Sequence, residues 1–327
     1  MPPDDFNPLG YWESEPVAAF HDRVLHALGT SWDAWTAIES DRAARFAHEL
    51  TPLISAEFGA APIFVVKDPR MCRLVPLWLS TLETSGITPG AILVVRGPVE
   101  VSRSLAARDR MPSTFALLLW LRHMLDAEYG TRALPRAIVS YDALMTDWRE
   151  EVRQISTGLG IAWPCSAETA GESVAQFLAS DLRHHVPGAE ALEAPPLLDR
   201  WIVETCDAFE QLRRRDVVST ARAFSTLDEV RSRLDEAGRI FGAPDEAMRS
   251  ELNRRLEHAE ADRREADRRA SAVQDQAAAL RRTNQALADG LDAARHEVAA
   301  LRASGSWRAT APLRALYRLA QKTSGRS

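Results

Sequence analysis

The stretch AILVVRGPVEVSRSL, residues 91–105, joins an apolar run, a positive charge and a turn into a helix. Its apolar, β-branched half predicts a buried strand over 92–95 that ends at Arg96. Gly97 and Pro98 then turn the chain into a helical pattern that carries Ser104, and proline suits a first helical position. Ligands of open parallel sheets bind beyond the carboxyl ends of the strands, where a guanidinium can grip a phosphate. The stretch therefore predicts an anion site, although an arginine in this position also occurs as a plain surface ion pair.

A second stretch, IFVVKDPR at 63–70, has the same pattern. Its first four residues predict another buried strand, and Lys67 and Asp68 follow directly. If the two strands are neighbours, Lys67 and Arg96 meet at one edge of the sheet and form an anion pocket. The alternative is that Lys67 and Asp68 pair locally while Asp68 caps the following helix.

A third apolar run, at 137–140, completes an alternation of strand and helix signals. This alternation predicts an α/β domain with a parallel sheet covered by helices. Helical patterns cover residues 15–28, 41–57, 71–84, 98–109, 114–129, 142–159 and 196–215.

Composition limits the function classes. The 327 residues are 46% hydrophobic and 26% charged, which predicts a folded domain with an extension. A net charge of −6 argues against a general nucleic-acid binder, so no nucleic-acid partner is expected. The cysteines, Cys72, Cys165 and Cys206, show no paired spacing, and the chain has no leader-like start or apolar span. These features favour a cytoplasmic protein.

The chain divides near residue 225 into a domain over 1–225, a coiled coil over 226–303 and a tail over 304–327. Within 252–301, steps of four and three from Leu252 meet apolar residues at thirteen of fifteen positions. This heptad seam predicts a coiled coil, and Asn284 at an a position favours a parallel homodimer through these residues. The alternative is a solvated single helix, because the middle of the seam is rich in alanine.

The tail contains six basic residues after Leu301 and no acidic side chain. Leu313, Leu316 and Tyr317 fall on one helical face. A basic amphipathic helix is typical of peripheral contact with a membrane, here the inner membrane, or with an acidic partner. The alternative is a solvated terminus.

Several motifs together resemble the bacterial sulfotransferases of polysaccharide gene clusters. VVRGPVEVSRSL resembles that family's 3′-phosphate motif, an arginine followed eight residues later by a serine. VSYDALMTDWREEVRQISTGLGI, KDPR, NPLGYWES and LLLWLRHMLDAE resemble further family segments. The resemblance implies a P-loop-NTPase-like sulfotransferase fold and 3′-phosphoadenosine 5′-phosphosulfate as sulfuryl donor. It also implies a glycan or glycolipid acceptor, with Arg96 and Ser104 binding the donor's 3′-phosphate.

One family segment has no counterpart in the sequence. The first strand and the 5′-phosphosulfate loop of the family find no match, and no Walker A pattern, GxxxxGK[ST], occurs. In the family that segment comes just before the part matched by NPLGYWES, and we expect its absence to reflect a start codon assigned too far downstream or a truncated gene. The alternative function is a catalytically inactive, sulfotransferase-like scaffold that dimerises by its coiled coil and binds glycan-assembly enzymes.

Sulfuryl transfer needs a base for the acceptor hydroxyl and a cation for the developing negative charge. The resemblance favours the region after the first family helix for the base, which gives Glu13 and His21, with Asp22 as a neighbour. Lys67 is the best candidate for the cation. The structural alternatives are a first-turn helix acid for Glu13 and a surface histidine for His21.

A further set of residues is assigned to the acceptor: Arg70, Arg122, His123, His184 and His185. Arg122 and His123 form a polar pair on an apolar helix, and the alternative is that the pair faces solvent. His184 and His185 lie in a predicted loop without a third ligand at metal-binding spacing, so no metal site is expected. A plain surface loop is the alternative for that histidine pair.

Overall fold

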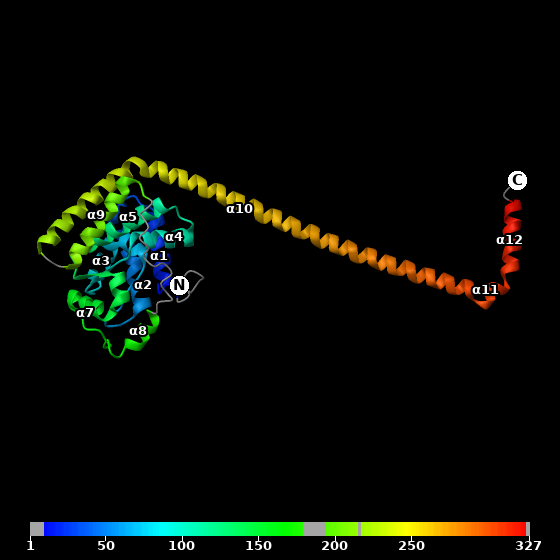
Figure 1. Cartoon of the computed structure of the whole chain (residues 1–327), viewed down its shortest axis with the longest axis horizontal. Coiled ribbons are helices and arrows are strands. Elements are labelled where there is room, and N and C mark those ends of the chain that lie inside the picture. Colours follow the sequence, from blue (N-terminus) through cyan, green and yellow to red (C-terminus); the bar gives the residue numbers. More distant parts are fainter. Residues whose placement is uncertain (1–9, 179–193, 215–216, 325–327) are drawn as a thin grey trace. The chain divides into compact units, whose positions relative to one another are not determined.

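The computed structural model of the chain describes residues 10–178, 194–214 and 217–324. The chain divides into two compact units, Met1–Asp245 and Glu246–Ser327. The first contains a small sheet and most of the helices (Figure 1), and α10 (Val217–Ala303) begins in the first unit and ends in the second. The fold is mostly helical with a parallel α/β element.

The sheet consists of two parallel strands, β1 (Ala91–Val95) and β2 (Arg136–Ser140). Leu93 lies opposite Ile138 and Val95 opposite Ser140. Helices α4 (Pro98–Asp109) and α5 (Ser113–Thr131) form the crossover between the strands. The predicted strands over 92–95 and 137–140 and their parallel direction are thus confirmed.

The third predicted strand, over 63–66, is wrong: these residues form no strand. A strand needs a neighbour whose peptide groups complete its ladder, and within the described residues β1 pairs with β2 alone. Phe64 and Val66 instead pack against the core of the neighbouring helices, while Val65 is 67% exposed. An apolar run shows that residues seek burial, and does not show that a strand partner exists.

The two faces of the sheet are covered unequally. Leu93 packs on one face against α5, α9 and the start of α10. On the other face α7 (Trp148–Leu159) covers β2, where Ala137 and Val139 are buried against Ile155. Ile92 and Val94 share that face on β1, and they are 36% and 49% exposed.

The helices of the first unit form two large hydrophobic cores. One core is built by α1, α2 and α3 with the 3₁₀ segments around them, and the other by α5, α9 and α10. Their bounds are α1 Glu15–Ala27, η1 Ser40–Phe46, α2 Ala47–Phe58, η2 Pro69–Arg73, α3 Val75–Thr84, α6 Tyr141–Thr146, α8 Gly171–Phe177 and α9 Pro196–Arg214. The predicted helix over 142–159 is divided at Asp147, and Ser140 rather than Asp142 caps its start.

The first part of α10 belongs to the first unit. Ala223, Leu227, Val230 and Leu234 are fully buried, and their spacing of four and three residues forms one helical stripe. Pro244 lies inside the helix immediately before the unit ends. The packed unit therefore includes α10 residues well past 225.

The second unit contains the rest of α10, followed by α11 (Gly305–Ala309) and α12 (Ala311–Ser324). Leucines of the heptad seam are exposed along α10, among them Leu252, Leu280 and Leu287. No helix in the described part of the chain is both long and apolar enough to cross a bilayer.

Candidate functional site

Arg96 lies where β1 ends and α4 begins. Its Nε donates to Glu100 Oε2 at 3.0 Å, and its guanidinium lies over the Tyr141 ring, 4.7 Å from the centroid. The Nη1 and Nη2 groups have no hydrogen-bond partner among the residues that the structure describes. Because the Arg96 side chain is 31% exposed, these two donors can reach a ligand.

The local backbone explains this position. Trp120 Nε1 donates to the Arg96 carbonyl at 3.1 Å, which fixes the chain where the strand ends. Gly97 is the N-cap of α4 and supplies no side-chain cap, and Pro98 is the first helical residue. The first turn of α4 thus presents its positive dipole end beside Arg96.

The two serines of α4 have different environments. Ser102 is buried and its hydroxyl donates to the Ser113 carbonyl at 3.4 Å, so it fastens α4 to α5. Ser104 is half-buried, and no described residue bonds its hydroxyl. Of the two, Ser104 is the one with a hydroxyl available to a ligand.

Tyr141 was not singled out in the sequence, although a signal for it exists. The parallel register places Val95 opposite Ser140, the last residues of the two strands. Arg96 and Tyr141, which follow them, therefore lie at the same edge of the sheet. The Tyr141 ring contacts the face of the Arg96 guanidinium in a cation–π interaction.

Two of the predicted catalytic residues, Lys67 and Glu13, lie in direct contact. Lys67 Nζ donates to Glu13 Oε1 at 2.6 Å and to the Tyr11 carbonyl at 3.0 Å. The Glu13 side chain is 7% exposed and that of Lys67 is 60% exposed. The pair offers a carboxylate and an ammonium group in direct contact, with the ammonium open to solvent.

His21 is fully buried. Trp78 Nε1 donates to His21 Nε2 at 2.8 Å, and because an indole nitrogen only donates, Nε2 is the unprotonated nitrogen. Nδ1 then carries the proton and faces Asp68 Oδ2 at 3.5 Å, which is too long for a regular hydrogen bond. Both ring nitrogens face protein groups, so His21 offers none to an acceptor in this arrangement.

Asp68 links His21 to Arg70. Its Oδ1 accepts from the Arg70 backbone N–H at 2.7 Å, so Asp68 caps η2 as the sequence predicts. Burial alone would raise the pKa of this carboxyl, but its interactions with His21 and Arg70 outweigh burial and lower the pKa. Arg70 also donates from Nε to Asp22 Oδ1 at 2.6 Å, so its guanidinium is held between two carboxylates.

Arg122 is buried in a network of ion pairs. Its Nε donates to the Trp35 carbonyl at 2.8 Å, Nη1 to Asp126 Oδ1 at 3.2 Å and Nη2 to Asp235 Oδ1 at 2.5 Å. Each nitrogen therefore has a partner within the protein, and the side chain joins α5 to α10. Arg73, also buried, pairs with Asp126 through Nε at 2.8 Å. This second arginine was missed because its sequence context carries no periodic signal.

His123 lies one residue further on α5 and is half-buried. Its Nδ1 donates to the Leu119 carbonyl at 2.9 Å. Burial, and then the positive charge of Arg73, lower the pKa of His123 to about 4. The imidazole is therefore neutral at pH 7. His184 and His185 lie outside the described residues.

Comparison of the chain with protein-family models, with curated proteins and with solved structures finds no match. Within the described residues, no group of three or more histidine, cysteine, aspartate or glutamate side chains is placed to hold a metal ion. The function must therefore be argued from the motifs and from the geometry around Arg96 and Lys67.

Proposed function

We propose that the protein is a sulfotransferase that moves a sulfuryl group from 3′-phosphoadenosine 5′-phosphosulfate to a hydroxyl of a glycan or glycolipid. The setting is cell-surface polysaccharide biosynthesis, in the cytoplasm and at the inner membrane. The observation that carries this proposal is Arg96 at the carboxyl end of β1, with two unpartnered Nη groups beside the first turn of α4.

The geometry suits the donor's 3′-phosphate. Glu100 holds Nε and Tyr141 supports the guanidinium face, so both contacts fix the plane in which the Nη donors point. Two parallel hydrogen bonds from a guanidinium match the oxygens of a phosphate. Ser104 adds a hydroxyl from the same helix, as in the family motif.

We assign the chemistry to the Lys67–Glu13 pair, a carboxylate and an ammonium group in direct contact. In this proposal the Glu13 carboxylate takes the proton of the acceptor hydroxyl while the hydroxyl oxygen bonds to sulfur. The bond between sulfur and the bridging phosphate oxygen breaks, and adenosine 3′,5′-bisphosphate leaves. Lys67 stabilises negative charge on that oxygen. His21 acts indirectly, by holding Asp68, whose contacts position Arg70.

Calorimetry with adenosine 3′,5′-bisphosphate tests the donor site. We expect binding by the full chain and its loss in Arg96→Ala. Arg153→Ala is the matched control, because Arg153 is exposed and pairs with Glu150 on α7, outside this site. Unfolding curves of both variants exclude a general loss of structure. Binding that Arg96→Ala leaves unchanged would reject the assignment.

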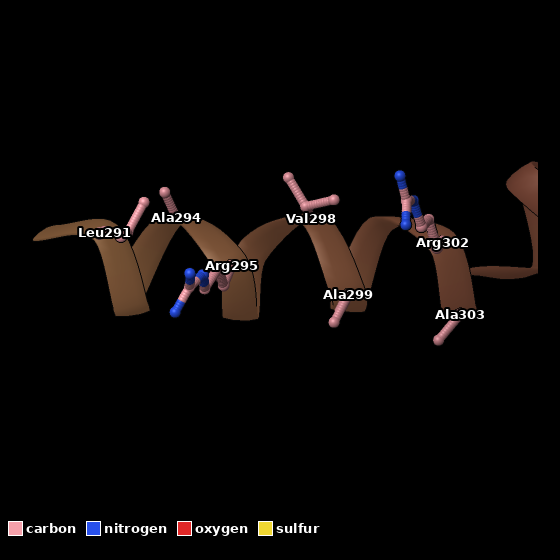
Figure 2. Close-up of a pocket in the computed structure, with 7 residues that line it drawn as sticks. All are labelled: Leu291, Ala294, Arg295, Val298, Ala299, Arg302 and Ala303. Carbon is pink, nitrogen blue, oxygen red and sulfur yellow. The ribbon is translucent and has the colours of Figure 1, made fainter.

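A second candidate function is that of an inactive scaffold joined by its coiled coil. The exposed seam favours it: Leu291, Ala294 and Val298 point to the same side of α10, and the hollow they line runs along the surface of a single helix (Figure 2). Such a surface suits another helix better than a small molecule. In this proposal two copies pair in parallel over residues 252–301, with Asn284 facing its counterpart.

Sedimentation velocity and the bisphosphate titration separate the two candidates. The scaffold function requires a dimer that does not bind the bisphosphate, whereas the enzyme requires nucleotide binding in either oligomeric state. Leu280→Glu with Leu287→Glu is expected to give monomers, because two charges would enter the seam. Glu257→Lys with Arg282→Glu, outside the seam, is the control and should leave the dimer intact.

A further inference from the structure

The surface that remains without a role lies on α11 and α12. Four large side chains here are exposed: Trp307 at 41%, Leu313 at 68%, Leu316 at 65% and Tyr317 at 66%. Leu313, Leu316 and Tyr317 follow the spacing of a single helical face. Within the part of the chain that the structure describes, these side chains are covered by no core.

Positive charge occupies the opposite side of the same helix. Arg314, Arg318 and Lys322 recur every four residues, which places their positions on one stripe of α12. No acidic side chain occurs anywhere after Leu301. The helix therefore has an apolar face and a face on which every charged residue is basic.

Arg314 joins α11 to this surface. Its guanidinium lies 3.8 Å from the centroid of the Trp307 ring, and it donates to the Trp307 carbonyl and to Thr310 Oγ1. These contacts fasten Trp307 beside the start of α12. Tryptophan and tyrosine are enriched where a bilayer meets water, because one end of each side chain is apolar and the other is polar.

We propose that α11 and α12 bind the surface of an anionic bilayer. Leu313, Leu316 and Tyr317 enter the boundary between headgroups and acyl chains, and the basic stripe contacts anionic lipid headgroups. The apolar face decides between a bilayer and a nucleic acid. A phosphodiester backbone would use the arginines and would leave the exposed leucines without a role. One such helix binds weakly, and two tails on a dimer bind more tightly through avidity.

Co-sedimentation of the full chain with vesicles tests the proposal. We expect binding to vesicles of phosphatidylglycerol and phosphatidylcholine, and much weaker binding to phosphatidylcholine alone. Arg308 is exposed on α11, and Arg318 belongs to the basic stripe of α12. Arg308→Gln with Arg318→Gln should lower the partition coefficient roughly 30-fold, from the usual contribution of a basic residue near an anionic surface. This pair leaves Arg314 in its contacts with Trp307. The control, Arg268→Gln with Arg282→Gln, removes the same charge from exposed positions of α10 and should change binding little.

The apolar face needs its own variant. Leu313→Ser with Leu316→Ser should reduce vesicle binding at least as strongly as the charge variant, without changing the binding of bisphosphate. Equal binding to both vesicle types would overturn the proposal. So would binding to duplex DNA that depends on Arg308 and Arg318 but not on the two leucines, because that pattern identifies a polyanion surface. Since the donor titration is separate, each proposal can fail alone.

Discussion

Two ion pairs with the same helical spacing behave differently in this molecule. Arg122 and Asp126 on α5 have side chains 0% and 12% exposed, whereas Arg269 and Glu265 on α10 are 78% and 43% exposed. The first pair lies in a buried network with Arg73 and Asp235, whereas in the second Glu265 is shared between two exposed arginines, Arg268 and Arg269. Water competes for the second pair but not for the first. Sequence spacing therefore identifies a pair, whereas burial determines how much the stability of the fold depends on that pair.

Removing the shared carboxylate should have the largest effect. Asp126→Ala leaves the charges of Arg73 and Arg122 buried with fewer partners, so we expect a loss of about 3–5 kcal/mol in the free energy of unfolding. Urea unfolding followed by circular dichroism measures it. Asp126→Asn keeps the shape and hydrogen-bonding atoms and should cost less. A loss below about 1 kcal/mol would show that water reaches the network.

The Trp78–His21 contact sharpens the comparison with a neutral pair. His21→Leu leaves the buried Trp78 N–H without its acceptor, and the expected cost is about 1–3 kcal/mol. The double variant His21→Leu with Trp78→Phe removes both polar groups and should recover part of this loss. If the double variant is simply additive, the two side chains are not coupled.

The pH dependence of stability tests His123. Its pKa is about 4 in the fold and near 6.5 in the unfolded chain, so the unfolded state binds more protons between these values. Stability should therefore fall as the pH drops from about 6.5 towards 4. Allowing for partial exposure, we expect a loss of about 1 kcal/mol at pH 5 relative to pH 7. His123→Gln should lack this contribution, and an unchanged pH profile in that variant would contradict the assignment.

The exposed pair should show the smallest effect. Glu265→Ala removes the shared partner of the exposed side chains of Arg268 and Arg269, and is expected to change the free energy of unfolding by less than about 0.5 kcal/mol. Measured under the same conditions as Asp126→Ala, it is the matched control for that variant. Equal losses in the two variants would mean that the difference in burial has no energetic consequence.

The features that depend on neighbouring residues could be predicted from the sequence. The strand before Arg96, the helix at Pro98 and the cap by Asp68 each follow from a few adjacent residues. The strand over 63–66 could not be predicted in this way, because a strand also needs a partner elsewhere in the chain. Arg122 shows that the partners of a predicted site residue cannot be predicted from its neighbours either. Its polar position on an apolar helix was visible, but its bonds to Trp35 and Asp235 cross 87 and 113 residues.

The uneven covering of the sheet has a practical consequence for handling the protein. Ile92 and Val94 present two exposed aliphatic side chains side by side on a strand that pairs on one edge only, within the described residues. Such a surface attracts other apolar surfaces, including hydrophobic dyes and the same strand of another molecule. The apparent molecular mass of this protein in light scattering should rise with protein concentration, and Ile92→Thr with Val94→Thr should reduce that rise.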